Sequence, residues 1–171
     1  MSEPAASPGV CFTLDGRKMT ALSGETIWQA ARRAGLTIPH LCTQAAPDYL
    51  PGGNCRACLV DIDGERNLAP SCSRQVTEGM QVRSDSSERA LRSRRLVMEL
   101  LLADQPPRAR AHDRNASFWH WAEQVGLQHS RFPARAKGAA AASADRSHPA
   151  MIVQLDACIH CQLCVQACRD I

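Results

Sequence analysis

The chain has 171 residues and a formal net charge of +3 at pH 7. This length suits one ordinary domain or two small ones, and the charge is too small to predict a nucleic-acid partner. No run of about 18 apolar residues occurs, so we predict no membrane span. The N-terminus has neither a basic segment nor an apolar run, which argues against a signal peptide and favours a cytoplasmic location. In that reducing setting the clustered cysteines, eight of the nine, are expected to bind metal rather than to form disulfides.

The N-terminal part of the chain predicts a small mixed sheet and one helix. Residues 10–22 predict a β-hairpin, because Asp15-Gly16 is a turn pair that supplies positive φ. A short helix is expected after Thr26, with Gly35 as its C-cap. Further strands are expected at 58–64, around Leu68 and at 80–83. This order of elements is typical of an α+β fold, and it predicts a domain of the ubiquitin-like β-grasp type over residues 8–84, the arrangement on which plant-type ferredoxins are built.

Downstream of this domain the pattern is first helical and then irregular. A helix is expected over 85–103, opened by a capping-box-like pair of Asp85 and Glu88 and stopped by Pro106-Pro107. Its buried side is expected to hold Leu91, Met98, Leu101 and Leu102. A second amphipathic helix is expected over 116–127. We therefore predict a helical connector at 85–133, an Ala-rich linker at 134–149 and a strand at 151–155.

The sharpest motif is a run of cysteines near the C-terminal end, spaced C-x2-C-x2-C-x3-C: Cys158, Cys161, Cys164 and Cys168. Three thiolates at this spacing let one loop surround a 4Fe–4S cubane, and the fourth normally ligates the other cluster of a two-cluster ferredoxin. Cys168 is thus expected to bind either this cluster or a second one. Residues 150–171 are predicted to be the N-terminal part of a 4Fe–4S ferredoxin domain, completed by a longer polypeptide or by a partner chain.

Four further cysteines lie closer to the N-terminus: Cys42, Cys55, Cys58 and Cys72. Four thiolates suffice for a 2Fe–2S cluster, and the central C-x2-C pair supplies two of them from one loop. A four-thiolate zinc site is the competing interpretation, which would make the chain a structural interaction module. The β-grasp context and the second motif disfavour it. The remaining cysteine, Cys11, is expected to be a small buried hydrophobe on a strand.

Three other residues of the N-terminal cysteine loop are candidate cofactor-binding residues. Gly52 and Gly53 would let the backbone approach the inorganic sulfides, because a Cβ there would obstruct N–H···S hydrogen bonds. Arg56 lies between two of the cysteines, and a positive charge near the cluster favours its reduced form. No catalytic residue is predicted within the chain.

With both motifs in view, the chain resembles the N-terminal iron–sulfur region of a family of NAD-linked oxidoreductases. The family includes the large iron–sulfur subunit of NADH dehydrogenase, the diaphorase subunit of NAD-reducing hydrogenases and the alpha subunit of molybdopterin-dependent formate dehydrogenases. The resemblance rests on TIPHLC (37–42), GGNCRACLVDIDGER (52–66), LAPSC (68–72), VMELLLADQP (97–106) and CIHCQLCVQAC (158–168). The NCRAC and LAPSC segments look most like the formate dehydrogenase branch.

One departure from this family is clear in the sequence. Relatives usually carry a one-histidine, three-cysteine 4Fe–4S site after the helix at 85–103. The corresponding positions here are Gln105, Ala109, His112 and Phe118, so none of the four ligands is present. We expect that cluster to be absent, with Phe118, Trp119 and Trp121 filling the space.

The resemblance implies one-electron relay through iron–sulfur clusters in a multi-subunit enzyme, most simply formate oxidation or CO2 reduction coupled to NAD. It places molybdopterin with Mo or W in the remainder of a larger alpha subunit, and flavin and NAD in a partner subunit. The alternative within the class is the iron–sulfur subunit of an NADH dehydrogenase or of a hydrogenase diaphorase.

Overall fold

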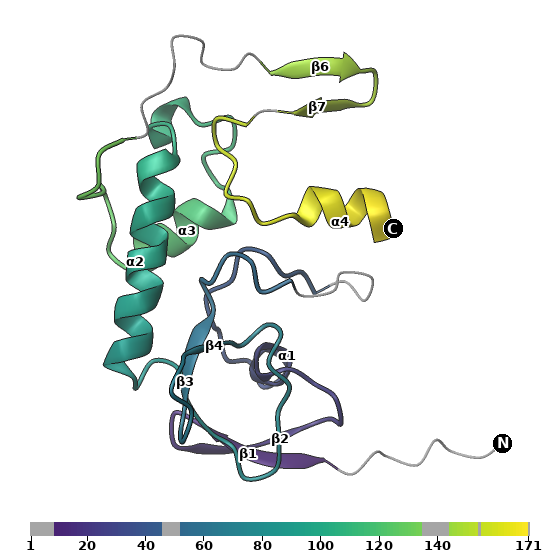
Figure 1. Ribbon diagram of the computed structural model, residues 1–171, viewed down its shortest axis with the longest axis vertical. Helices are drawn as coiled ribbons and strands as arrows, with labels where there is room; N and C mark the ends of the chain where they lie inside the picture. Colours follow the sequence, from purple (N-terminus) through teal and green to yellow (C-terminus); the bar gives the residue numbers. More distant parts are fainter. Residues whose placement is uncertain (1–8, 46–51, 135–143, 154, 171) are drawn as a thin grey trace, which may run out of the picture. The chain divides into compact units, whose positions relative to one another are not determined.

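The computed structural model describes residues 9–45, 52–134, 144–153 and 155–170 (Figure 1). The chain forms two compact units, one running to Arg94 and including the segment from Gln162 onward, the other running from Arg95 to Cys161. The domain boundaries given by the sequence pattern stay a prediction, and most of the 134–149 linker lies outside the described residues. None of the helices in the described ranges is both long enough and apolar enough to cross a lipid bilayer.

The first unit contains a five-stranded mixed sheet. Its strands are β1 (Val10–Leu14), β2 (Arg17–Ala21), β3 (Leu59–Ile62), β4 (Ala69–Pro70) and β5 (Gln81–Arg83), in the order β2-β1-β5-β3-β4. The central pair β1 and β5 is parallel, and the other pairs are antiparallel. Asp15 and Gly16 have φ values of 48° and 78° between β1 and β2, which confirms the predicted hairpin turn.

Helix α1 (Ile27–Arg33) supplies the helical part of the core in this unit. Thr26 and Gln29 form a reciprocal capping box at its start, and Gly35 follows it with φ 74°. The helix buries Ile27, Trp28, Ala30 and Ala31, while the sheet buries Phe12, Leu14, Val60, Ile62 and Val82. A mixed sheet packed with one helix agrees with the predicted α+β ferredoxin-type domain.

The prediction that Cys11 is buried is wrong. Side chains alternate across a strand, and β1 turns Phe12 and Leu14 into the core, so Cys11 points the other way and is exposed. Its backbone N–H donates to Glu78 Oε2 at 2.8 Å.

Helix α2 (Glu88–Asp104) begins slightly later than predicted and buries a different face. The hydroxyl of Ser87 accepts a hydrogen bond from the Ala90 backbone at 3.2 Å, so this serine caps the helix start in place of Asp85. The buried stripe contains Ala90, Arg94 and Met98. Leu91 is off that stripe and 45% exposed, so its predicted burial is wrong.

The second unit contains the rest of α2, a short 3-10 helix (Arg108–Arg110) and α3 (Ser117–Gln124). Helix α3 buries Phe118, Trp119, Trp121 and Ala122. The predicted end of this helix at Leu127 is too late, because Gly126 adopts φ 67° and the chain turns there. The buried carboxylate of Glu99 on α2 accepts hydrogen bonds from Arg131, which ties the segment after α3 to α2.

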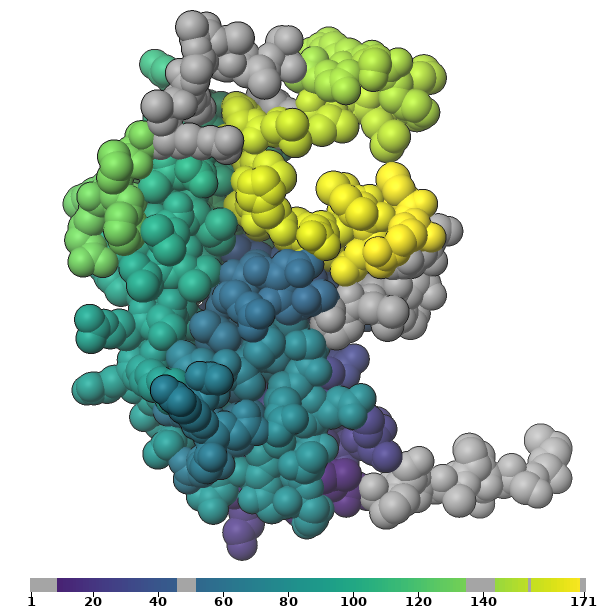
Figure 2. All heavy atoms as spheres, viewed as in Figure 1, coloured from purple at the N-terminus to yellow at the C-terminus, as the bar shows by residue number. Residues whose placement is uncertain are grey.

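The C-terminal part of the chain forms a hairpin followed by a helix. Strands β6 (Asp145–His148) and β7 (Met151–Val153) are antiparallel and form the yellow-green part of Figure 2. The apolar side chains of β7 are exposed. The sequence predicted β7 but assigned β6 to the linker. Helix α4 (Leu163–Asp170) closes the described chain.

Candidate iron–sulfur site

Four of the predicted ligands converge in the first unit. Cys42 lies in the loop after α1, Cys55 and Cys58 lie in the loop before β3, and Cys72 follows β4. All four side chains are buried, with exposures of 1%, 7%, 1% and 1% in that order. Thiols from three separate loops are therefore enclosed together inside one domain.

The pairing of β3 with β4 positions two of these ligands. Leu59 pairs with Pro70 and Val60 with Ala69 in an antiparallel register. Cys58 directly precedes this pair and Ser71 directly follows it, and the Ser71 backbone N–H donates to the Cys58 carbonyl at 3.1 Å. Cys72 therefore leaves the ladder beside Cys58.

Helix α1 fixes the loop that carries Cys72. The backbone N–H of Trp28 donates to the carbonyl of Ser71 at 3.0 Å, and that of Ile27 donates to the carbonyl of Arg74 at 2.9 Å. The Trp28 ring also meets the His40 ring edge-on, with centroids 4.9 Å apart. Because His40 precedes Cys42 by two residues, the same helix supports ligand loops on both sides of it.

Hydrogen bonds among the sulfurs show how closely the thiols approach. The thiols of Cys55 and Cys72 donate to Cys42 and hold the pKa of Cys42 at about 2, far below its ordinary value. The same hydrogen bonds raise the pKa of Cys55 and Cys72, and burial adds to this rise. A hydrogen bond from Cys72 lowers the pKa of Cys58 to about 7. The four thiols are thus linked to one another by hydrogen bonds in the order Cys55, Cys42, Cys72 and Cys58.

The backbone of the loop turns its N–H groups towards the sulfurs. The N–H of Cys55 donates to Cys42 Sγ at 3.5 Å. Gly53 and Arg56 adopt left-handed φ values of 64° and 58°, which strains a non-glycine residue such as Arg56. A Cβ on Gly52 would lie 2.6 Å from the side-chain nitrogen of Asn54, and one on Gly53 would lie 3.3 Å from Ser73 Oγ. At both positions a side chain would therefore crowd a neighbouring polar group.

The donor set suits a cluster of two irons. A 2Fe–2S cluster is held by four cysteine thiolates, two on each iron, and these four sulfurs are close together and shielded from water. Within the described ranges, no three or more His, Cys, Asp or Glu side chains are placed around a single metal ion. A binuclear cluster does not require such a convergence on one point.

Comparison with known proteins agrees with this geometry. Residues 7–87 match the family described as the 2Fe-2S iron-sulfur cluster binding domain. This part of the chain is a 2Fe–2S domain. The match encloses Cys42, Cys55, Cys58 and Cys72, together with all five strands of the sheet and α1.

Two curated relatives and one solved structure resemble most of the chain. The NADP-reducing hydrogenase subunit HndD of Solidesulfovibrio fructosivorans is 33% identical over 94% of this chain and 28% of its own length. The 78 kDa subunit of mitochondrial NADH-ubiquinone oxidoreductase from Candida albicans is 35% identical over 93% of this chain and 22% of its own. A crystal structure of NAD+-reducing [NiFe]-hydrogenase in the H2-reduced state is 32% identical, with a TM-score of 0.80, over 92% of this chain and 65% of that chain.

These comparisons show that the chain is similar to subunits of NADH-ubiquinone oxidoreductase and of NADP- and NAD+-reducing hydrogenases. The chain spans about a quarter of the length of the curated relatives it matches.

The C-terminal cysteines occupy a loop and the helix after it. Cys158 and Cys161 are partly exposed in the loop, while Cys164 and Cys168 are exposed on α4, four residues apart on one helix face. His160 and Gln162 adopt positive φ values of 54° and 64°, and the His160 N–H donates to Cys158 Sγ at 3.4 Å. The 4Fe–4S assignment of these residues stays a prediction.

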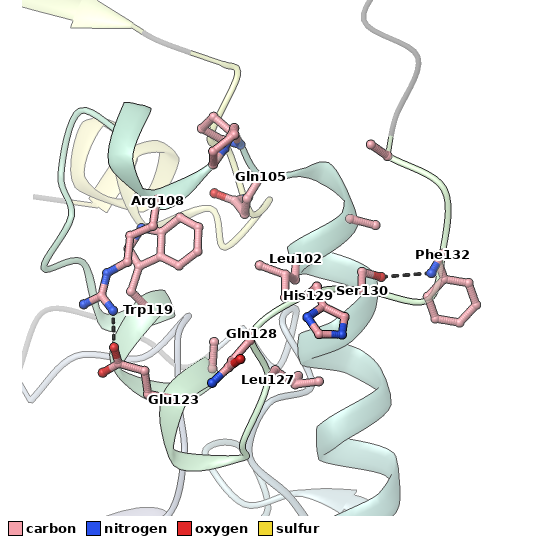
Figure 3. A pocket seen from close by; sticks show the side chains of 15 residues that line it. Leu102, Gln105, Arg108, Trp119, Glu123, Leu127, Gln128, His129, Ser130 and Phe132 are labelled. Carbon is pink, nitrogen blue, oxygen red and sulfur yellow. Dashed lines mark hydrogen bonds and ion pairs between the residues drawn. The ribbon is translucent and has the colours of Figure 1, made fainter.

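The positions that correspond to the family's one-histidine, three-cysteine site lie in the second unit. Among them, Gln105 lines a pocket of about 560 Å³, whose walls also include Trp119, Leu127, His129 and Phe132 (Figure 3). Phe118 packs edge-on against Trp119, with ring centroids 5.0 Å apart, and both rings are buried. These aromatic side chains of α3 are therefore part of the packed interior of this unit.

One residue of the site was missed by the sequence analysis. Ser71 is completely buried beside the ligands, and its carbonyl and N–H make the backbone contacts described above. A serine next to a cysteine carries no distinctive signal in a single sequence. Only the strand register places it opposite Cys58.

Proposed function

We propose that this chain carries single electrons through iron–sulfur clusters in an NAD-linked oxidoreductase complex of the NADH dehydrogenase or NAD-reducing hydrogenase type. The observation that carries the proposal is the convergence of four buried thiols at the end of the β3–β4 pair. A 2Fe–2S cluster held there supplies one-electron transfer. The chain's own residues provide the ligands, exclude water and set the surrounding charge.

Within this function the residues of the cysteine loop have distinct roles. Cys42, Cys55, Cys58 and Cys72 would hold the cluster. Gly52 and Gly53 keep the loop tight, so that N–H groups such as that of Cys55 can face sulfur. The exposed guanidinium of Arg56 would favour the reduced, more negative state of the cluster.

A second cluster would be held by the C-terminal motif. Cys158, Cys161 and Cys164 would ligate a 4Fe–4S cluster, and Cys168 would ligate either the same cluster or a second one. The two left-handed residues in the loop and the N–H···S contact at Cys158 support this proposal, because such loops turn amide groups towards cluster sulfur. The rest of a larger subunit, or a partner chain, would complete the ligand set.

The identity of the whole enzyme is the finer part of the proposal. The relatives named above are hydrogenase and NADH dehydrogenase subunits, and they favour those two classes over a formate dehydrogenase. The NCRAC and LAPSC segments are what favours the formate dehydrogenase branch, in which molybdopterin would be bound elsewhere in the same subunit. In each case flavin and NAD would be bound by a partner subunit, in the cytoplasm.

Low-temperature EPR of the anaerobically purified, dithionite-reduced protein tests the proposal, with iron and zinc counted on the same sample. We expect one slowly relaxing 2Fe–2S signal and one faster-relaxing cubane signal. Stoichiometric zinc in a colourless sample without iron would overturn electron transfer and support a structural zinc module. Loss of the cubane signal alone would restrict the proposal to the N-terminal cluster.

A further inference from the structure

A buried hydroxyl group lies at the 2Fe–2S site without an assigned role. Ser71 is 0% exposed, and its Oγ has no hydrogen-bond partner among the residues that the structure describes. A buried hydroxyl that makes no hydrogen bond is costly, because folding removes it from water without compensation. Serine at this position therefore lowers the stability of the protein unless its hydroxyl has a hydrogen-bond acceptor in the functional protein.

The strand register identifies that acceptor. Leu59 pairs with Pro70 and Val60 with Ala69, so the next step along the ladder places Cys58 opposite Ser71. The hydrogen bond from the Ser71 N–H to the Cys58 carbonyl at 3.1 Å continues the ladder to this step. Side chains of directly opposed residues lie on the same face of a sheet, with Cβ atoms about 5 Å apart.

Two hydrogen bonds hold the backbone of Ser71 in this position. Its N–H is bonded to Cys58 and its carbonyl accepts from Trp28 at 3.0 Å. A hydroxyl donor near sulfur stabilises the negative thiolate.

We propose that Ser71 donates an O–H···S hydrogen bond to the Cys58 thiolate and thereby raises the reduction potential of the 2Fe–2S cluster. The inference rests on the proposed 2Fe–2S site. Reduction adds an electron to the cluster, and a donor at a ligand sulfur stabilises the extra negative charge. Ser71 acts as a positioning and tuning residue, and Cys58 remains the ligand.

The test is an EPR-monitored redox titration of the full chain with Ser71→Ala, beside the unsubstituted protein. Removing the donor should disfavour reduction about tenfold, which for one electron is about 59 mV towards lower potential. Ser73→Ala is the matched control, because that hydroxyl is exposed and bonded to the Pro70 carbonyl at 3.4 Å. Its potential should not change. Ser71→Thr keeps the hydroxyl and should restore most of the potential.

If the Ser71→Ala protein does not bind its cluster, the hydrogen bond can be measured in the unsubstituted protein instead. Electron–nuclear double resonance of the reduced unsubstituted protein, in H2O and in D2O, should detect a strongly coupled exchangeable proton beyond those of the backbone amides. The absence of this coupling, or an unchanged potential in a fully loaded Ser71→Ala protein, would overturn the role of Ser71. A missing 2Fe–2S signal in the unsubstituted protein would instead refute the proposed function.

Discussion

At the scale of single residues, burial separates the four cysteines proposed to bind the 2Fe–2S cluster from Cys11. Cys42 is buried among three other thiols, whereas Cys11 is exposed on β1. Cys42→Ser should abolish the slowly relaxing EPR signal and remove about two irons per chain, because a 2Fe–2S cluster needs four thiolates. Cys11→Ser is the matched control and should keep both the EPR signal and the two irons. Iron analysis with EPR checks this prediction.

Glycine at position 53 combines a left-handed backbone conformation with a place in the ligand loop. Its φ of 64° disfavours any residue with a Cβ, so Gly53→Ala should cost about 1–2 kcal/mol of stability and lower the iron content. Gly64→Ala carries a similar penalty, since φ is 83°, but the residue lies in open space after β3. Thermal unfolding and iron analysis of both variants measure this. Equal iron loss in the two would attribute the effect to general destabilisation.

At the scale of elements, α1 matters because its first turn holds the loop of Cys72. Thr26 Oγ1 accepts from the Gln29 N–H at 3.3 Å, and Gln29 Oε1 accepts from the Thr26 N–H at 2.9 Å. Thr26→Ala breaks this capping box and should destabilise the first unit by about 1 kcal/mol. Thr77→Ala, in an exposed loop, should change stability little. Chemical denaturation monitored by circular dichroism compares them, and equal midpoints would contradict the assigned cap.

The ion pair between α2 and the segment after α3 predicts that the free energy of unfolding depends on pH. The side chain of Glu99 is 4% exposed and bonded to Arg131 at 2.8 Å. The guanidinium holds the pKa of Glu99 at about 2, below its ordinary 4.5. Because the folded-state pKa is the lower one, the stabilisation is fully present above pH 4.5 and is lost as the pH falls towards 2.

Glu99→Gln should therefore lower the melting temperature by the same amount at about pH 8 and about pH 5.5. Glu123→Gln is the control, because its ion pair with Arg108 is largely exposed and should contribute little. Differential scanning calorimetry at the two pH values gives the comparison. If the drop in melting temperature caused by Glu99→Gln were smaller at pH 5.5 than at pH 8, a group other than Glu99 would control the pH dependence of this contact.

At the scale of the whole molecule, the two cysteine motifs should bind their clusters independently. Cys161→Ser should remove the faster-relaxing cubane signal and leave the 2Fe–2S signal intact, whereas Cys42→Ser should do the reverse. The basis is that the ligands of the 2Fe–2S domain all lie between Cys42 and Cys72, within one sheet domain. Loss of both signals in either variant would indicate that one cluster is needed to form the other.

Much of this fold could be predicted from local sequence signals. The Asp15-Gly16 turn and the apolar spacing of α1 each act over a few residues, and the structure agrees with them. The errors concern features that depend on three-dimensional context. Leu91 is exposed because α2 packs through the stripe of Arg94 and Met98, and a buried arginine is not expected from its polarity. Ser71 was overlooked because only strand pairing places it at the site.

The position of β5 has a consequence for how the protein is made. This strand lies between β1 and β3 at the centre of the sheet, yet it is the last of the five in the chain. During synthesis, Cys72 leaves the ribosome before Gln81–Arg83 can join the two halves of the sheet. The two halves of the sheet can therefore join only after all four of these cysteines have been synthesised.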